Sequence, residues 1–185
     1  QDVTDFTGSG YISINAKHLE LIRKGEKGSN KVSKINKQIS ELPGYEGVVG
    51  RGQRGGVTAE MWRKWESGEW AQTWWTCPSS TSAKPSKVFG SDSTGVCYIV
   101  LTKGKRNAWV QRISQHESEH EALFMGDSVF RVVATASGEP VGGGGHTRLL
   151  VLEEMDYGEI PEEKQAAPPK FTTRQVWDAF TNDAN

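Results

Sequence analysis

The feature that most constrains the fold is the order in which two hydrophobic periodicities occur along the chain. The first 45 residues carry apolar side chains at helical spacing, at Ile14, Leu19 and Ile22 and again over residues 32–42. From residue 73 onward, short runs rich in β-branched and aromatic residues alternate with turns rich in Gly, Asp and Ser. Helices first and strands last favour an α+β domain over alternating βαβ units.

Three helices are expected before the strands. The first covers residues 14–22, the second is capped by Ser29 or Asn30 and stopped by Pro43, and the third runs from Ala59 to about Ala71. A short strand at 47–49 and a glycine-rich turn at 50–56 separate the last two helices. The later strands are expected at residues 73–76, 96–102, 108–113, 121–124, 129–136 and 148–153. A turn is expected at 137–145, in which residues 142–145 form a flexible hairpin loop.

Length, charge and cysteine content exclude several protein classes. The 185 residues suit one domain, with 22 basic against 23 acidic residues and a net charge of −1. This balance argues against a general nucleic-acid binder, and no apolar run is long enough to span a bilayer. Two cysteines cannot form a disulfide scaffold. The first residues lack signal-peptide features, so either none existed or it has been removed.

The end of the chain is expected to differ from the rest. Residues 159–170 are charged and rich in proline, which is typical of a linker. Thr172 and Gln175 then offer a capping box for a short amphipathic helix with Val176, Trp177 and Phe180. We therefore divide the chain into a main domain, residues 1–155, and a linker with a short C-terminal helix, residues 156–185.

Residues 50–55 match the G-x-G-x-x-G fingerprint of dinucleotide-binding proteins, which would place a pyrophosphate at the start of the Thr58 helix. The strand before it is only about three residues long, and no second βαβ unit follows. We therefore interpret the glycines as a turn.

The acidic segment 117–124, ESEHEALF, is the most informative part of the sequence. Glu119 and Glu121 lie two residues apart, so at a strand edge they project to the same side. Adjacent carboxylates repel each other, a condition found often at acid/base sites. Taken alone, such a cluster is most often a solvated loop.

The surroundings of this cluster favour a more specific interpretation. With Ile113-Ser114 before it and residues 122–133 after it, the segment resembles the I-S…E-x-E-(V/A)-L-F signature of the bacterial mono-ADP-ribosyltransferase toxins. Residues 42–52, LPGYEGVVGRG, resemble the strand of that family that carries its arginine. Ser80-Thr81-Ser82, followed by Phe89, resembles the Ser-Thr-Ser motif. The resemblance covers roughly residues 8–154. Gly50 stands where the family usually has an aromatic residue, and Arg51 fits the motif register better than Arg54.

The resemblance implies a role for each motif residue. The family cleaves the nicotinamide–ribose bond of NAD and transfers ADP-ribose to a protein side chain. Glu121 would be the catalytic glutamate, held by Ser80, and Glu119 would engage the acceptor. Because Glu119 is a glutamate, arginine is the implied acceptor. The implied NAD-binding residues are Arg51, which would bind the pyrophosphate, Gly52, Thr81, Ser82 and Phe89.

Two of these roles have alternatives. Thr81 and Ser82 are expected to act mainly by supporting the local backbone. Phe89 is either a stacking platform for nicotinamide or a core residue. The chemistry requires NAD as substrate and no metal.

The implied fold is an α+β, ADP-ribosyltransferase-like arrangement of two roughly perpendicular β-sheets around an NAD cleft, with helices at the N-terminus. The implied biology is a secreted toxin that acts inside a target cell, and actin is one target known for relatives. Two alternatives remain: an NAD glycohydrolase that uses water as acceptor, and a non-catalytic binding module that could use the tryptophan-rich segment 62–75.

Overall fold

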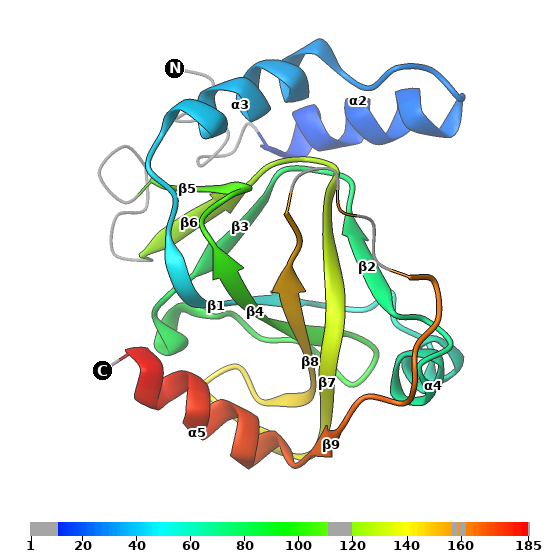
Figure 1. The fold of residues 1–185 in the computed structure, drawn as a ribbon, viewed down its shortest axis with the longest axis vertical. Helices are drawn as coiled ribbons and strands as arrows, with labels where there is room; N and C mark the ends of the chain where they lie inside the picture. Colours follow the sequence, from blue (N-terminus) through cyan, green and yellow to red (C-terminus); the bar gives the residue numbers. More distant parts are fainter. Residues whose placement is uncertain (1–10, 111–119, 157–158, 160–161, 185) are drawn as a thin grey trace.

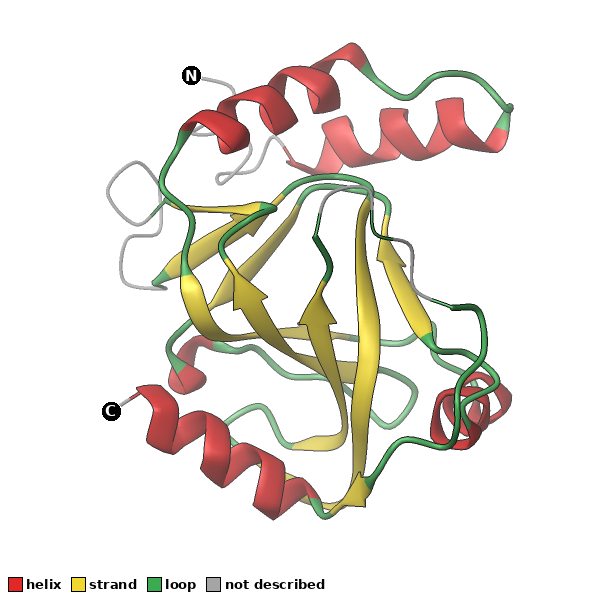
Figure 2. Ribbon diagram, viewed as in Figure 1, coloured by secondary structure: helices red, strands yellow, loops and turns green. Residues whose placement is uncertain are grey.

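The computed structural model describes residues 11–110, 120–156, 159 and 162–184 (Figure 1). The helices are α2 (Tyr11–Arg23), α3 (Asn30–Glu41), α4 (Ala59–Ser67), the short 3₁₀ helix η2 (Pro85–Lys87) and α5 (Thr173–Ala184). The strands are β1 (Glu46–Gln53), β2 (Gln72–Trp75), β3 (Ser79–Ser82), β4 (Val96–Lys103), β5 (Asn107–Trp109), β6 (Glu121–Phe124), β7 (Ser128–Val141), β8 (His146–Glu154) and β9 (Lys170–Phe171). The α+β prediction is confirmed, and Figure 2 shows helices around a central body of strands.

The described strands form one mixed sheet of nine strands in the order β2-β7-β8-β4-β1-β3-β6-β5, with β9 beside β7. Strand β1 pairs with β4 at eight positions but with β3 only at Gly50–Ser82. The two expected β-sheets are therefore two parts of one sheet, which this single pairing joins.

The structure corrects several expected element boundaries, of which three differ by four or more described residues. Residues 50–53 continue β1, because pairing with β4 satisfies their backbone groups, so the predicted turn over these residues is wrong. Helix α4 ends at Ser67, where Gly68 adopts a left-handed conformation, and does not reach Ala71. Strand β7 continues to Val141, which shortens the expected turn at 137–145 to residues 142–145.

Each of three helices buries apolar side chains against a different part of the sheet. Trp62 and Trp65 of α4 join a core cluster with Trp75, Phe124 and Phe130. Helix α3 buries Ile35 and Ile39 against β5 and β6. Helix α5 buries Trp177 and Phe180 against residues of β4, β7 and β8. The predicted capping box of α5 is confirmed, since Thr172 and Gln175 exchange hydrogen bonds.

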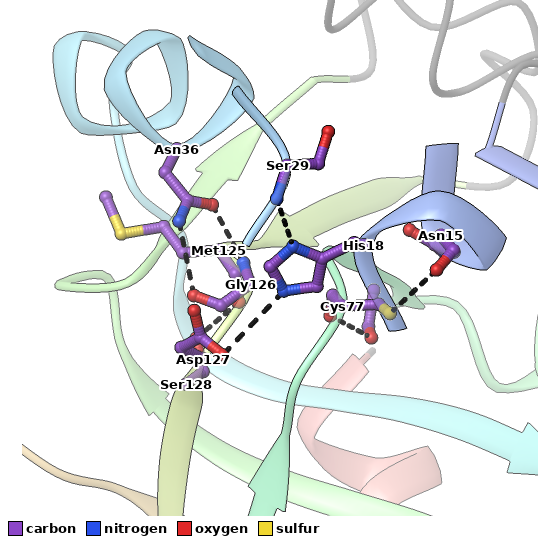
Figure 3. Close-up of polar contacts among 10 residues, drawn as sticks. Asn15, His18, Ser29, Asn36, Cys77, Met125, Gly126, Asp127 and Ser128 are labelled. Atoms are coloured by element: carbon purple, nitrogen blue, oxygen red, sulfur yellow. Dashed lines mark hydrogen bonds and ion pairs between the residues drawn. The ribbon is translucent and has the colours of Figure 1, made fainter. Parts of the chain in front are cut away.

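The N-terminal helices are tied to the turn between β6 and β7 (Figure 3). Asn36 of α3 donates a hydrogen bond to the carbonyl oxygen of Gly126 (3.3 Å) and accepts one from its N–H (2.8 Å). His18 of α2 accepts from the N–H of Ser29 (3.1 Å), and its Nε2 lies 3.9 Å from Asp127. Within the part of the chain that the structure describes, no helix is long and apolar enough to cross a membrane.

Candidate active site

Strands β3 and β6 bring Ser80 and Glu121 together. Ser82 pairs with Glu121, and side chains two residues apart project to the same face, so Ser80 also faces this carboxylate. The Ser80 hydroxyl donates a hydrogen bond to Oε2 of Glu121. The Glu121 side chain is 2% exposed. The two residues that the sequence motifs assigned to one function are therefore in contact, although they lie 41 positions apart.

Arg51 reaches the same site from β1. Its Nη1 donates a hydrogen bond to the carbonyl oxygen of Ser80 (3.0 Å). Across the sheet, Arg51 pairs with Tyr98 of β4, whose hydroxyl donates to Oε1 of Gln53 (2.9 Å). Burial raises the pKa of Tyr98 to about 12, against the opposing effect of Arg51, so the tyrosine remains a neutral donor. Arg54 is exposed and does not line the pocket beside Arg51.

A pocket of about 120 Å³ joins the arginine to the Ser-Thr-Ser segment. A cavity of this size holds about one aromatic ring. Its walls come from β1, β3, and the end of η2 with the chain after it. The lining residues are Gly50, Arg51, Gly52, Ser80, Thr81, Ser82, Lys87, Val88 and Phe89. Sequence reasoning missed Lys87, a second cation beside Arg51, although it lies only two positions before Phe89.

Gly52 and Phe89 meet at close range in this pocket. A Cβ atom on Gly52 would lie 2.0 Å from the carbonyl oxygen of Phe89, so only glycine fits. The Phe89 side chain is 63% exposed at the edge of the pocket. Of the two roles considered for Phe89, core packing is therefore inconsistent with the structure.

Thr81 and Ser82 use their hydroxyls within the protein. Thr81 is buried and donates to the carbonyl oxygen of Ala122 (2.7 Å). The Ser82 hydroxyl donates to the carbonyl oxygen of Lys84 (3.2 Å) and accepts from its N–H (3.1 Å). These contacts match a role in supporting the backbone, and a direct contact with NAD stays a prediction.

Other motif residues lie outside the described part of the chain. These are Glu119, Ile113 and Ser114. The described chain resumes at His120, whose carbonyl oxygen accepts from the N–H of Ala83 (3.1 Å). Among the described residues, no group of three or more His, Cys, Asp or Glu side chains could hold a metal ion. The expectation that no metal is needed stays a prediction.

Among known proteins, similarity is found only to solved structures and not at the level of sequence. No protein-family model matches the chain, and no curated protein matches its sequence. Three solved structures illustrate the structural similarity. The ADP-ribosyltransferase Vis of Vibrio splendidus, in complex with agmatine, superposes with a TM-score of 0.61 over 92% of this chain and 78% of its own, at 18% identity.

The other two are also bacterial proteins. Plx2a, an ADP-ribosyltransferase toxin from Paenibacillus larvae, gives a TM-score of 0.57 at 15% identity and 84% coverage of both chains. The catalytic domain of VahC from Aeromonas hydrophila gives 0.56 at 13% identity, over 83% of this chain and 96% of its own. At these identities the similarity establishes the fold. The resemblance drawn from the motifs is confirmed at that level.

Proposed function

We propose that this chain, which has the fold of the ADP-ribosyltransferases, cleaves the nicotinamide–ribose bond of NAD and transfers ADP-ribose to an arginine of a target protein. The observation that supports this most is the linked set of Arg51, Ser80 and Glu121. These residues come from three strands and are joined by hydrogen bonds, and Arg51 and Ser80 line one pocket. A module that only binds a partner has no need of such an arrangement.

Glu121 would stabilise the reacting ribose. As the C–N bond breaks, nicotinamide leaves with the bonding electrons and positive charge develops on the ribose, as in glycoside cleavage. A carboxylate placed beside that ring lowers the energy of the charged transition state and can hold a ribose hydroxyl. The Ser80 hydroxyl would keep the Glu121 side chain in one rotamer during this step.

The pocket would bind the nicotinamide half of NAD. Its volume of about 120 Å³ suits one ring, with Phe89 exposed at the edge as a stacking surface. Arg51 would bind the pyrophosphate, because a guanidinium forms paired hydrogen bonds with phosphate oxygens. Lys87, which lines the same pocket, would add a second positive charge. The rest of the dinucleotide would extend outward from the pocket.

Glu119 would select arginine as the acceptor. A carboxylate can hold a guanidinium through two hydrogen bonds and favour attack by its nitrogen on the ribose, with loss of one proton. The Vis structure in complex with agmatine, a guanidinium compound, supports this choice. By similarity to these toxins, we also propose that the protein is secreted and acts inside a target cell. Actin is one candidate target.

The test is incubation of the pure protein with NAD, with and without agmatine, followed by mass spectrometry of nicotinamide and ADP-ribosyl-agmatine. The expected result is an agmatine adduct that forms together with nicotinamide. Nicotinamide without an adduct would instead indicate an NAD glycohydrolase or a different acceptor. Neither product, together with no binding of NAD, would indicate a non-catalytic module.

A further inference from the structure

One wall of the pocket is a short segment without regular structure. We call residues 88–91 the pocket loop. Val88 and Phe89 line the pocket, and Gly90 and Ser91 follow on the way to β4. Because the Phe89 side chain is 63% exposed, side-chain packing does little to hold it. The position of Phe89 therefore depends on what anchors the backbone of the pocket loop.

Val88 is fixed in part by burial of its own side chain and by a hydrogen bond from its N–H to Pro85. His146, the first residue of β8, provides a second anchor, which also reaches Ser91. Its side chain is completely buried. Nε2 lies 3.3 Å from the carbonyl oxygen of Val88, and Nδ1 lies 3.0 Å from Oγ of Ser91. A carbonyl oxygen can only accept, so Nε2 carries the proton, and Nδ1 accepts from the Ser91 hydroxyl. The two bonds fall on either side of Phe89 and Gly90.

The turn that precedes His146 packs closely against the same loop. A Cβ atom on Gly144 would lie 2.7 Å from Cα of Gly90 and 2.9 Å from Nε2 of His146. The turn before β8 therefore packs against the pocket loop without room for a side chain. On the other side, the Trp177 ring of α5 lies 5.2 Å from the His146 ring, tilted by 39°. Helix α5 therefore packs against the histidine that is hydrogen-bonded to the loop.

We propose that His146 is a positioning residue for NAD. It holds the pocket loop in place, so that the backbone of Phe89 stays against Gly52, next to Arg51. This inference rests on the proposed function. The close approach of the Phe89 carbonyl to Gly52 means that a small displacement of the loop changes the width of the pocket. The expected consequence of losing the anchor is weaker NAD binding with unchanged bond cleavage, because Ser80 and Glu121 are brought together by the pairing of β3 with β6.

A matched pair of variants tests this. In His146→Gln the longer side chain can still donate to the Val88 carbonyl oxygen, whereas in His146→Asn the amide can reach only Ser91. Ser91→Ala removes the other bond and keeps the histidine. The measurements are KM for NAD and kcat for nicotinamide release, together with the melting temperature of each variant.

We expect His146→Asn to raise KM for NAD about tenfold, the change that follows from losing one hydrogen bond at a buried site, with kcat within about twofold of wild type. His146→Gln should have a KM closer to wild type. Ser91→Ala should raise KM less than His146→Asn does. An equal KM in the Asn and Gln variants, or a loss confined to kcat, would overturn the proposal. If His146→Asn does not fold, Ser91→Ala tests the proposal instead. An unchanged KM for NAD in that variant would overturn the proposal.

Hydrogen exchange separates this inference from the proposed function. If the wild-type protein releases no nicotinamide, the proposed function fails, and exchange of the backbone amides of residues 88–91 decides the inference without NAD. Faster exchange in His146→Asn than in His146→Gln supports the anchor. Equal exchange in the two variants contradicts it.

Discussion

The hydroxyl of Ser80 donates a hydrogen bond to Oε2 of Glu121 across the paired strands β3 and β6. Ser80 also accepts a hydrogen bond from Arg51 through its carbonyl oxygen. One serine therefore links the carboxylate expected to face the ribose with the cation expected to face the pyrophosphate. Substitutions of the three residues should consequently have different effects.

Removal of the carboxylate should have the largest effect. We expect Glu121→Ala to lower the rate of nicotinamide release by about 100-fold or more, because the developing charge on the ribose loses its main stabilising group. Ser80→Ala should cost about tenfold, since the carboxylate remains but its rotamer is no longer held. Steady-state assays of nicotinamide release measure both. Glu139→Ala, at an exposed position of β7, is the control that should behave as wild type. Wild-type activity in Ser80→Ala would contradict the role given to that hydroxyl.

Glu119 should separate the two half-reactions. We expect Glu119→Ala to abolish formation of ADP-ribosyl-agmatine while nicotinamide release stays within about threefold of wild type, because only the acceptor loses its carboxylate partner. Glu119→Gln, with nearly the same shape and no charge, should show the same division. Both products are quantified in the same reaction. A parallel loss of both products would show that Glu119 acts on the cleavage step.

Arg51 and Arg54 form a matched pair three residues apart. Arg51→Lys should raise KM for NAD about tenfold, because an ammonium cannot form the paired hydrogen bonds of a guanidinium. Arg54→Lys, at the exposed position outside the pocket, should leave KM unchanged. Titration of NAD consumption against NAD concentration gives both constants. The assignment is reversed if Arg54→Lys has the larger effect.

Helix α5 should contribute to the stability of the whole domain. Trp177 is 7% exposed and belongs to the same apolar cluster as Cys97 and Leu149. We expect Trp177→Ala to lower the free energy of unfolding by about 3–5 kcal/mol, as for other large aromatic side chains removed from a core. Asp178→Ala, next to it on the exposed face, should change it by less than about 0.5 kcal/mol. Denaturant titrations compare the two, and similar values would mean that α5 is only loosely attached.

The stability of the protein should fall at mildly acidic pH because of His146. Burial lowers the pKa of this side chain below its ordinary value of 6.5 in the folded protein. As the pH drops below 6.5, the unfolded chain binds a proton that the folded chain does not, so the folded state loses stability until the folded pKa is reached. At a pH well above 6.5 both states are neutral at this residue. The free energy of unfolding of the wild type should therefore decrease more steeply between about pH 7 and 5 than that of His146→Gln. If the free energies of unfolding of the two proteins fall in parallel with pH, His146 is not the cause of the loss of stability.

The fold class and most elements could be predicted from local signals. The strand at residues 121–124 and the capping box at Thr172 and Gln175 follow from side-chain patterns that act over a few residues. The path of residues 50–53 could not, because glycines read locally as a turn and the pairing partner, β4, begins 43 positions later. Propensity was overridden there by tertiary hydrogen bonding.

The candidate site could likewise be predicted only in part. Its motif residues could be identified because their order along the chain resembles a known family. The role of His146 could not be identified, since it arises from contacts with residues 88 and 91 that lie more than 50 positions earlier. Of the glycines at 142–145, interpreted as a flexible hairpin loop, Gly144 packs closely against Gly90.

The position of Arg51 between two glycines has a further consequence for how this site can vary. Strand β1 is held in register with β4 at eight positions, and neighbouring side chains of a strand point to opposite faces. A slip of one residue in either direction would bring Gly50 or Gly52 to the place of the guanidinium, so the pocket would face a hydrogen atom. An insertion or deletion that shifts the register of β1 by one residue would therefore remove the guanidinium from the pocket and leave Lys87 as the cation that lines it.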